Sequence, residues 1–404
     1  MVECVQYNQM KDTREQWLGQ IPVSWNLLRL KRIFAIKKDI AGEEGHTVLS
    51  VTQKGIRPKV MSEKGQFALD YSKYQLVNRG EFVMNHMDLL TGWVDISDYD
   101  GVTSPDYRVF INTNPNRFES RYYRYIFQLC YSARIFYGLG QGVAGFGRWR
   151  LPANMFLNFV LPVPSVVEQS TIAEYLDYQT SKIDSIIADA QASIDEYKQW
   201  KQSLIFETVT KGLHNDVATR YSGEYWIGDI PKSWRLIKVK HVVKIENGSD
   251  PHTEGDIPVY GSGVGSFKTC GEFKEGPAVL LGRKGTVNIP RYVEGKYWNV
   301  DTAFNATSVS EELNIKYFYY VATCFDYPAY KSQTTLPSMT QTIYNNIKIP
   351  FPPIDEQSEI TNWLDNKLEE IDSYVEEKQS MIRDLEAYRL SLIYETTTGK
   401  RKVV

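Results

Sequence analysis

The chain has 404 residues, a net charge of −3, 42% hydrophobic residues and 24% charged residues, which is typical of globular proteins. This length predicts two or three domains, each large enough to bury its own core. No apolar run reaches the roughly 20 residues that cross a bilayer, and the polar start does not match a signal peptide. The four cysteines are scattered without metal-ligand spacing. We therefore expect a cytoplasmic protein with free thiols, without a membrane segment or a metal site.

Charge is unevenly distributed along the chain. Residues 165–212 and 355–395 together carry a net charge of −12, which leaves +9 for the rest. Nucleic acid would bind the basic parts and be repelled by the acidic ones. The charges could equally coat solvent-exposed faces without any polyanionic partner. The distribution alone leaves both alternatives open.

The first globular stretch is predicted from about residue 17 to residue 160. It opens with a motif that runs from Trp17 to Trp25, and it is rich in Tyr, Phe, Val, Ile and Gly. Turn signals such as Asp100-Gly101 divide it into short segments, which predicts mostly short strands. Residues 122–137 are predicted to be helical.

The first long helix is predicted within residues 161–212. A Pro-x-Pro pair, which separates strand from helix, precedes Glu168-Gln169, and no Gly or Pro interrupts the chain from there to its threonine-rich end. Glu168 would lie in the first turn, where free N–H groups favour negative charge. Apolar residues recur every seven positions, which predicts a coiled-coil helix. One seam comprises Leu176, Ile183, Ala190, Tyr197 and Leu204, and a second comprises Ile172, Ile186 and Trp200.

The second half repeats this order of parts. A motif from Trp226 to Trp234 opens a globular stretch that continues to residue 348, with a helix predicted at residues 315–325. The helix block then recurs without gaps, at the constant spacing that relates Glu168-Gln169 to Glu356-Gln357, and we call this spacing the repeat offset. Such a long-period repeat indicates one structural unit used twice. The seams of the second helix comprise Leu364, Ile371, Leu385 and Leu392, and Ile360, Tyr374, Met381 and Tyr388.

The two long helices are expected to pair as an antiparallel coiled coil. Each has a narrow apolar seam and a strongly charged remainder, although each helix could instead pack only on its own domain. A helix of about 38 residues would be roughly 57 Å long. An antiparallel pair would hold the two globular domains at its opposite ends, as a spacer of fixed length.

The sequence thus predicts an α+β fold with a pseudo-twofold internal repeat, in which two mixed α/β domains are separated by two long repeated helices. The first domain would comprise residues 1–160 and the central helix residues 161–212. The second domain would comprise residues 213–348 and the C-terminal helix residues 349–404. Beyond their opening motifs the halves share little sequence, yet residues 80–84 and 276–280 look like one strand in two versions.

The order of these parts resembles the specificity (S) subunit of type I restriction-modification systems. The Trp-Leu/Ile-Gly-x-Ile-Pro openings, the dissimilar domains and the Pro-x-Pro-x-x-x-Glu-Gln entry into long helices carry the resemblance, which covers nearly the whole chain. Residues 257–263, 282–285 and 301–304 are similar to stretches of that family's target recognition domain. Residues 99–107 resemble another subtype of the same domain.

The resemblance implies a non-catalytic subunit whose two target recognition domains each read one half of a split double-stranded DNA site. The helices would fix the gap between the halves and dock two modification (methyltransferase) subunits, and restriction subunits with translocase and nuclease activity would complete the complex. Adenine methylation would use S-adenosylmethionine held by the methyltransferase, with no cofactor bound directly by this chain. A spacer of about 57 Å would exceed one duplex turn of about 34–36 Å.

Candidate DNA contacts in the second half lie in the family-like stretches. Arg283 and Lys284 form a basic loop after an apolar strand, and Arg can pair with guanine while Lys pairs with phosphate. Tyr260 and Ser262 flank a glycine in a segment whose N–H groups and hydroxyl could approach a phosphate. The alternatives are an ordinary charged hairpin for the first pair and a flexible turn for the second.

Further candidates are basic or polar side chains that could reach bases or phosphates. Two pairs lie at matching places just before the helix blocks, where their alternative role is to solvate packed neighbours. A third, weaker pair is more typical of plain surface. These candidates are Arg148 and Arg150 in the first half, Lys331 and Gln333 in the second, and the weaker patch of Lys54 and Arg57.

Enzymatic and purely structural functions are less well supported. Residues 140–145 match Gly-x-Gly-x-x-Gly, but no helix follows, which argues against a dinucleotide site. The Pro352-Pro353 pair lacks the leading Asn or Asp of adenine methyltransferases, and no carboxylate cluster indicates a nuclease. The alternatives kept open are a specificity subunit of a methylation-only or type IIG/IIB-like system, a self-contained DNA methyltransferase, and a coiled-coil scaffold.

Overall fold

The computed structural model describes residues 6–59, 70–142, 149–214, 216–332 and 336–403. The chain divides into two compact units, unit 1 with Met1–Asp189 and Ser380–Val404, and unit 2 with Ala190–Gln379. Each unit therefore combines one α+β body with half of each long helix. The four-part division at residues 160, 212 and 348 stays a prediction. No helix among the described residues is long and apolar enough to cross a membrane.

The two predicted long helices are α3 (Val166–Lys211) and α7 (Ile354–Thr397), of 46 and 44 residues. Acidic residues occupy the first turn of each, Glu168 in α3 and Asp355 and Glu356 in α7. The free N–H groups of a helix start favour negative charge there. α3 runs from unit 1 into unit 2, and α7 runs from unit 2 back into unit 1. The predicted pair of long helices is therefore confirmed.

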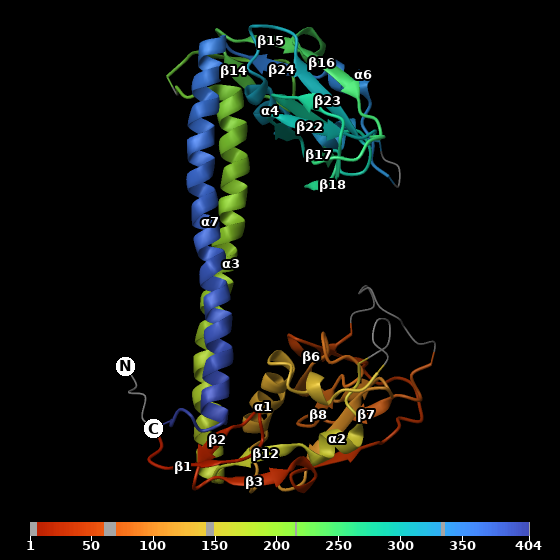
Figure 1. Cartoon of the computed structure of the whole chain (residues 1–404), viewed down its shortest axis with the longest axis vertical. Helices are drawn as coiled ribbons and strands as arrows, with labels where there is room; N and C mark the ends of the chain where they lie inside the picture. Colours follow the sequence, from red (N-terminus) through yellow and green to blue (C-terminus); the bar gives the residue numbers. More distant parts are fainter. Residues whose placement is uncertain (1–5, 60–69, 143–148, 215, 333–335, 404) are drawn as a thin grey trace. The chain divides into compact units, whose positions relative to one another are not determined.

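The body of unit 1 is built on a four-stranded antiparallel sheet in the order β4-β11-β8-β9. Helix α1 lies between the long helices and this sheet, and strand β12, paired with β3, leads into α3 (Figure 1). Its strands are β1 (Met10–Asp12), β2 (Gln20–Pro22), β3 (Asn26–Arg29), β4 (Phe34–Lys37), β5 (Leu49–Thr52), β6 (Gly55–Pro58), β7 (Gln75–Val77), β8 (Phe82–Met84), β9 (Val94–Ile96), β10 (Gly101–Thr103), β11 (Arg108–Asn112) and β12 (Val160–Val163). Its helices are η1 (Leu30–Arg32), α1 (Ser120–Ser132), η2 (Tyr137–Leu139) and α2 (Ala153–Asn158).

The body of unit 2 has the equivalent four-stranded sheet in the order β16-β23-β20-β21, and adds a second sheet in the order β18-β17-β22-β19. Its strands are β13 (Thr219–Tyr221), β14 (Asp229–Pro231), β15 (Arg235–Lys238), β16 (Val243–Asn247), β17 (Ile257–Tyr260), β18 (Ser266–Cys270), β19 (Lys274–Glu275), β20 (Ala278–Gly282), β21 (Arg291–Val293), β22 (Lys296–Asn299), β23 (Ala303–Ser308) and β24 (Lys348–Phe351). Its helices are η3 (Val239–His241), α4 (Ile315–Thr323), α5 (Tyr327–Tyr330) and α6 (Gln341–Asn346).

The two units share one fold despite their different sequences. In each main sheet the strand order follows the same chain order, a helix (α1 or α4) follows the second strand of the sheet, and an early strand pairs with the last one (β3 with β12, β15 with β24). Residues 80–84 and 276–280 look in sequence like versions of one strand. Strands β8 and β20 do occupy the same third position in the two sheets, but the strand pairing makes Met84 equivalent to Leu281, one residue beyond the sequence match. The internal repeat therefore extends beyond the segments whose sequences are visibly alike.

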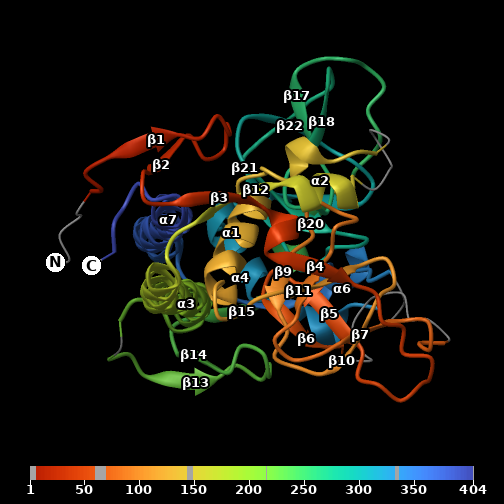
Figure 2. The ribbon, with the colours of Figure 1, turned by 90° about the horizontal axis from the view of Figure 1, so that it is seen from below.

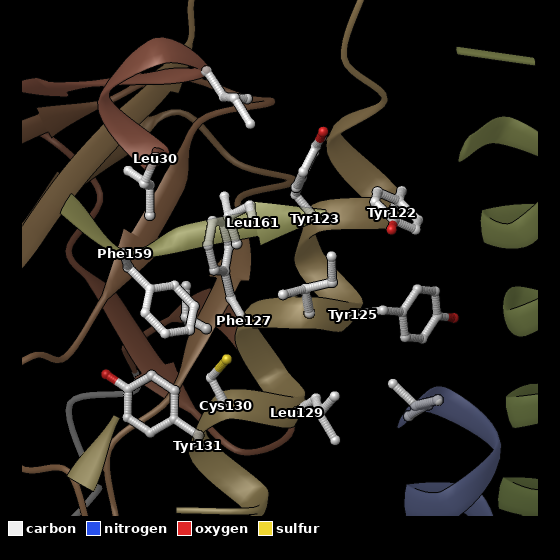
Figure 3. Packing of buried hydrophobic residues seen from close by; sticks show 14 of the residues in the cluster. Leu30, Tyr122, Tyr123, Tyr125, Phe127, Leu129, Cys130, Tyr131, Phe159 and Leu161 are labelled. Atoms are coloured by element: carbon white, nitrogen blue, oxygen red, sulfur yellow. The ribbon is translucent and has the colours of Figure 1, made fainter. Parts of the chain in front are cut away.

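The core of unit 1 is mostly aromatic and lies between α1 and the sheet. Phe127 is fully buried, and its ring centroid lies 5.4 Å from that of Phe34 and 5.5 Å from that of Phe110. In Figure 3, Tyr122 and Tyr125 project from α1 toward the long helices, on the opposite side from Phe127. Helix α1 thus contributes one face to the sheet and the other to α3 and α7.

Repeated side chains make repeated hydrogen bonds in the two units. In unit 1, the Tyr122 hydroxyl donates to the Thr397 carbonyl at 2.9 Å, and the Tyr125 hydroxyl donates to Asp177 at 2.7 Å. In unit 2, the Tyr317 hydroxyl donates to the Val209 carbonyl at 3.2 Å, and the Tyr320 hydroxyl donates to Asp365. The repeat offset separates Val209 from Thr397 and likewise Asp177 from Asp365. The repeat therefore preserves the positions that attach each body to the helices.

The Glu-Gln pair at the start of each block has a structural reason. The Gln169 amide oxygen accepts from the backbone N–H of Glu119 at 2.8 Å, and its nitrogen donates to the Pro164 carbonyl at 3.0 Å. Gln357 makes the same two bonds to Asn314 and Pro352, at 3.0 and 2.9 Å. Because both glutamines are fully buried, these bonds satisfy groups that would otherwise be costly to bury.

The helix ends also repeat one arrangement. Gly212 after α3 and Gly399 after α7 have positive φ, which glycine adopts without strain at a helix end. Gly212 packs close to Trp234 and Gly399 close to Trp25, the last residues of the two opening motifs. Figure 2 shows the β1–β2 hairpin beside α7 and the β13–β14 hairpin beside α3. Each opening motif therefore covers the end of one long helix.

Within each unit, the halves of α3 and α7 pair side by side. In unit 1, Arg389 lies 3.5 Å from Asp184. In unit 2, Tyr197 stacks on Tyr374 at 5.9 Å, and Lys201 lies 2.6 Å from Asp372. Because residue numbers rise in one helix as they fall in the other, the pair in unit 2 is antiparallel. The predicted pairing of the two copies is confirmed.

One predicted seam in each helix is right only at its first residue. Ile172 and Ile360 are fully buried, but Ile186, Trp200, Tyr374 and Tyr388 are exposed. Steps between the two seams of a heptad alternate between three and four residues. The predicted second seam lies three residues after members of the Leu176 series. In the structure the buried residues lie four residues after them, as Thr180 does after Leu176 and Ile194 after Ala190. The Leu176 and Leu364 seams, by contrast, do face the core.

Candidate nucleic-acid interface

The three family-like stretches of unit 2 meet at one end of its main sheet. The loop after β20 lies against residues 301–302, because the Arg283 N–H donates to the Thr302 carbonyl at 2.8 Å. The Ser262 hydroxyl donates to the Lys284 carbonyl at 2.7 Å, and the Ser262 N–H donates to the Thr302 hydroxyl at 3.4 Å. Residues far apart in sequence therefore form one cluster, which we call the Arg283 loop cluster (Tyr260, Ser262, Arg283, Lys284, Asp301 and Thr302).

The cations of this cluster are held in different ways. The Arg283 guanidinium is half-buried, lies 5.8 Å from the Phe304 ring centroid and donates to the Asp301 carbonyl at 3.3 Å. Lys284 is exposed and lies 3.4 Å from the Asp301 carboxylate. Stacking pre-organises a guanidinium while leaving donors for a planar acceptor, whereas an exposed ammonium acts as a point charge. The loop can thus offer one directional donor and one mobile charge.

Arg291 is a further cation that the sequence analysis missed. It lies on β21, its guanidinium is 5.0 Å from the Tyr260 ring centroid, and it donates to the Gly263 carbonyl at 3.2 Å. No motif marks it in the sequence, because only the fold brings β21 beside the segment after β17. Arg291 therefore braces the Tyr260 turn against the cluster.

The segment around Lys331 borders the same cluster. Ser338 forms an isolated β-bridge with Lys284, and the Ser332 N–H donates to the Ser338 carbonyl at 3.0 Å. Lys331, which is exposed, directly precedes this serine pair. The predicted candidate Gln333 lies outside the described residues. Lys331 can therefore extend the basic surface of the Arg283 loop cluster.

The candidates in unit 1 do not form a single group. Arg150 pairs through its backbone with Gln141, at 2.8 and 3.1 Å, whereas Lys54 lies beside a separate cavity of about 900 Å³ near α1 and the long helices. Arg57 lies across from Ser50 in the β5–β6 hairpin. Arg148 lies outside the described residues. The structure thus leaves Arg150 as the candidate near the chain segment that enters α2.

A second cavity, of about 620 Å³, lies beside Arg150, and we call it the Arg108 pocket. Arg108 is only 5% exposed, donates to the Leu151 carbonyl at 3.0 Å and lies 4.7 Å from the Phe156 ring centroid. Burial lowers the pKa of Arg108 to about 10, so it stays charged at neutral pH. The pocket lining includes Lys38, Gln75, His86, Asp106, Arg108, Gln141 and Arg150.

The Arg108 pocket was not predicted from the sequence. Arg108 is a single basic residue in the apolar run of β11, and His86 has no other histidine near it in the sequence. A lone cation at an inward-facing position of a strand was the available signal, because such a residue is seldom buried without a partner.

We expect the stability of unit 1 to fall as the pH drops from about 6.5 to about 4. Burial, followed by the charges of Arg108 and Arg150, lowers the pKa of His86 from 6.5 to about 4. Between these values the unfolded chain binds a proton that the folded chain does not, so acid favours unfolding, while above 6.5 the effect vanishes. Urea midpoints at pH 7 and pH 5 measure it. His86→Gln should reduce the difference between the two urea midpoints, whereas the control His252→Gln, at an exposed histidine, should not. An unchanged difference in His86→Gln would refute the assignment of this pH dependence to His86.

Within the ranges that the structure covers, no group of three or more His, Cys, Asp or Glu side chains could hold a metal ion. Burial raises the pKa of the Cys130 thiol well above its ordinary value, which makes this thiol unreactive.

Known proteins resemble the chain at both the domain and the full-length level. Residues 231–380 match the family model described as a type I restriction modification DNA specificity domain. The type I restriction enzyme MjaVIII specificity subunit of Methanocaldococcus jannaschii is 22% identical over 100% of this chain and 99% of its own length. The putative MjaX specificity subunit of the same organism is 21% identical over 100% of both chains.

Solved structures have the same fold. A chain from a type I R-M system matches with a TM-score of 0.73 and 14% identity, over 93% of this chain and 98% of that one. The HsdS subunit from Thermoanaerobacter tengcongensis matches with a TM-score of 0.53 and 15% identity, over 94% and 98%. The domain match and the full-length relatives agree with the order of motifs along the sequence: residues 231–380 match the type I specificity domain, and the whole chain is similar to type I restriction enzyme specificity subunits.

Proposed function

We propose that unit 1 and unit 2 each read one half of a bipartite DNA site, and that the chain thereby directs adenine methylation and restriction by partner subunits. The proposal rests on one observation: the two units share one fold, but different side chains lie at the equivalent end of their main sheets. Unit 2 has the Arg283 loop cluster there, and unit 1 has Arg150 and the Arg108 pocket. Two readers of one architecture and different side chains suit two different half-sites.

In unit 2, Arg283 is proposed to read a base and Lys284 to contact a phosphate. A guanidinium held against Phe304 can present two donors to guanine O6 and N7. An exposed lysine suits a phosphate, which needs charge rather than a fixed geometry. Tyr260, Ser262 and Lys331 would add contacts to the DNA backbone around Arg283 and Lys284.

Arg283→Ala should cost about 1–3 kcal/mol of binding to the cognate DNA and relax specificity at one base pair. Lys284→Ala should instead weaken binding to all sequences alike and reduce the slope of log K against log salt by about 0.9. Fluorescence anisotropy titrations with cognate and substituted duplexes at several salt concentrations measure both effects. Lys240→Ala removes an exposed charge on η3 in the same unit as a control. Equal, sequence-independent losses in both variants would contradict the assigned base contact.

The long helices are proposed to dock two copies of a methyltransferase subunit. Several large apolar side chains are exposed on them, and among these the repeat offset relates Ile186 to Tyr374 and Trp200 to Tyr388. Unit 1 thus presents Ile186 with Tyr388, and unit 2 presents Tyr374 with Trp200. Equivalent apolar positions on both units suit two copies of one partner. That partner would bind S-adenosylmethionine, restriction subunits would join the same complex, and the assembly would act in the cytoplasm.

Trp200→Ala should weaken binding of the methyltransferase at unit 2 by about 2 kcal/mol, because exposed tryptophans are frequent interface hot spots. Tyr225→Ala, at a side chain that is 93% exposed in the same unit, is the matched control and should have no effect. Analytical ultracentrifugation of the chain with the methyltransferase would show the loss of one bound copy. Full retention of two copies by the Trp200→Ala variant would count against helix docking.

A further inference from the structure

The backbone registers of the two main sheets relate the Arg108 pocket to the Arg283 loop cluster. In unit 1, the Leu151 N–H donates to the His86 carbonyl at 2.9 Å. In unit 2, the Met339 N–H donates to the Arg283 carbonyl at 3.0 Å. Leu151 and Met339 are separated by the repeat offset, the same spacing that relates the two long helices. His86 in unit 1 therefore occupies the position that Arg283 occupies in unit 2.

The neighbouring strands agree with this equivalence. Arg108 on β11 lies opposite Met84 on β8, and Phe304 on β23 lies opposite Leu281 on β20. Met84 comes two residues before His86, and Leu281 comes two residues before Arg283. Arg108 therefore stands where unit 2 has Phe304.

The aromatic neighbours below these positions correspond as well. Arg108 stacks on Phe156 at 4.7 Å, and Phe304 contacts Tyr344 at 5.9 Å. The repeat offset again separates Phe156 from Tyr344. The guanidinium of Arg283, on a loop of unit 2, thus has a counterpart in the guanidinium of Arg108, on a strand of unit 1. The two lie at equivalent ends of the two main sheets.

Arg108 has no counter-charge among the residues that the structure describes. No ion pair joins it to a carboxylate within those ranges, and its hydrogen bonds go to the Leu151 carbonyl and the Met84 sulfur. Asp106 contributes the acidic group of the pocket lining, against the cations Lys38, Arg108 and Arg150. Burying a cation without a partner costs free energy, which an anionic ligand would recover.

The remaining groups of the pocket favour an anion over a base edge. The Gln75 amide nitrogen already donates to the carbonyls of Ser104, Pro105 and Tyr107, at 3.0, 3.2 and 2.8 Å, and is not available to read a base. The remaining guanidinium donors of Arg108 can still bind phosphate oxygens in a charge-assisted way.

We propose that the Arg108 pocket binds a phosphate of the DNA backbone and is the unit 1 counterpart of the Arg283 loop cluster. The proposal rests on the proposed function, because it assumes that unit 1 contacts DNA. It identifies Arg108 as the principal contact, with Arg150 and Lys38 at the pocket surface. Lys54 and Arg57, on the β5–β6 hairpin, do not line this pocket.

The test is DNA binding by the full chain carrying Arg108→Gln, which removes the charge but keeps an amide that can donate to the Leu151 carbonyl. Anisotropy titrations use the duplex that the wild type binds and duplexes with single substitutions. We expect affinity to fall about tenfold at 0.15 M salt, by the same factor for every duplex, and the salt slope to fall by about 0.9. Arg79→Gln, in the exposed turn before β8, is the control and should match the wild type. Arg108→Lys should restore the slope.

Thermal unfolding separates a binding role from a structural one. Because Arg108 is a buried charge without a carboxylate partner, the melting temperature of Arg108→Gln should stay equal to that of the wild type or rise. A melting temperature several degrees lower, an unchanged salt slope, or loss confined to one substituted base pair would each overturn the phosphate assignment. Stabilisation of the wild type by inorganic phosphate with unaltered DNA binding in the variant would also overturn it. Failure of the wild type to bind any duplex would refute the proposed function itself.

Discussion

Replacing residues 226–348 with the recognition domain of another specificity subunit should change one part of the methylated DNA motif completely and leave the other part unchanged. The replaced residues hold the main sheet of unit 2 and the Arg283 loop cluster. They leave unit 1 and the Arg108 pocket intact. Because the two units are proposed to make separate contacts with DNA, the two halves of the motif should respond independently. Sequencing methylated adenines in a host that expresses the chimera with the methyltransferase measures the outcome.

The chimera must keep the attachments between the body of unit 2 and the helices. The donor domain needs a tyrosine at Tyr317 for the Val209 carbonyl and another at Tyr320 for Asp365. It also needs a backbone N–H at Asn314 for Gln357. A matched chimera with all of residues 17–160 replaced should change the other part of the motif. Changes in both parts after either exchange, in a complex that still assembles, would contradict independent reading.

Phe127→Ala should destabilise unit 1 by about 3–5 kcal/mol, a large share of the free energy of unfolding of a typical domain. The side chain is 0% exposed and packs among the rings of unit 1, so its removal leaves a cavity that the sheet cannot readily close. The ring partners of Phe127 are Phe34, Phe82, Phe110, Phe136 and Phe156.

Urea denaturation followed by hydrogen exchange of the α1 amides measures this loss in unit 1. The matched control is Phe267→Ala, which removes the same group from a side chain that is 61% exposed and should cost less than about 0.5 kcal/mol. A loss below about 1 kcal/mol for Phe127→Ala would mean that the aromatic cluster is not the core of unit 1.

The long helices could be predicted from the sequence because their determinants are local. Seven-residue spacing, acidic first turns and the lack of Gly and Pro specify α3 and α7 without tertiary information. The second seam could not be predicted in the same way. Steps of three and four residues are both compatible with the Leu176 series. Only packing against the partner helix makes Ile187, rather than Ile186, the inward-facing residue.

The candidate site was predictable only where a motif marks it. Residues 257–263, 282–285 and 301–304 are marked by resemblance, and they converge through the bonds of Ser262 and Thr302. Arg108 carries no motif, because its place opposite Met84 follows from strand pairing rather than from neighbours in sequence. The equivalence of the units likewise emerges from hydrogen bonds such as that of Leu151 to His86, which no spacing in the sequence encodes.

We propose that the chain contributes two dissimilar DNA readers and that its long helices fix the number of base pairs left unread between them. Single-molecule sequencing of methylated adenines in a host that expresses the wild-type chain with its methyltransferase tests this claim most directly. We predict one motif with two specified parts and an unspecified middle of constant length. A single uninterrupted motif, or two parts separated by a variable number of base pairs, would contradict it.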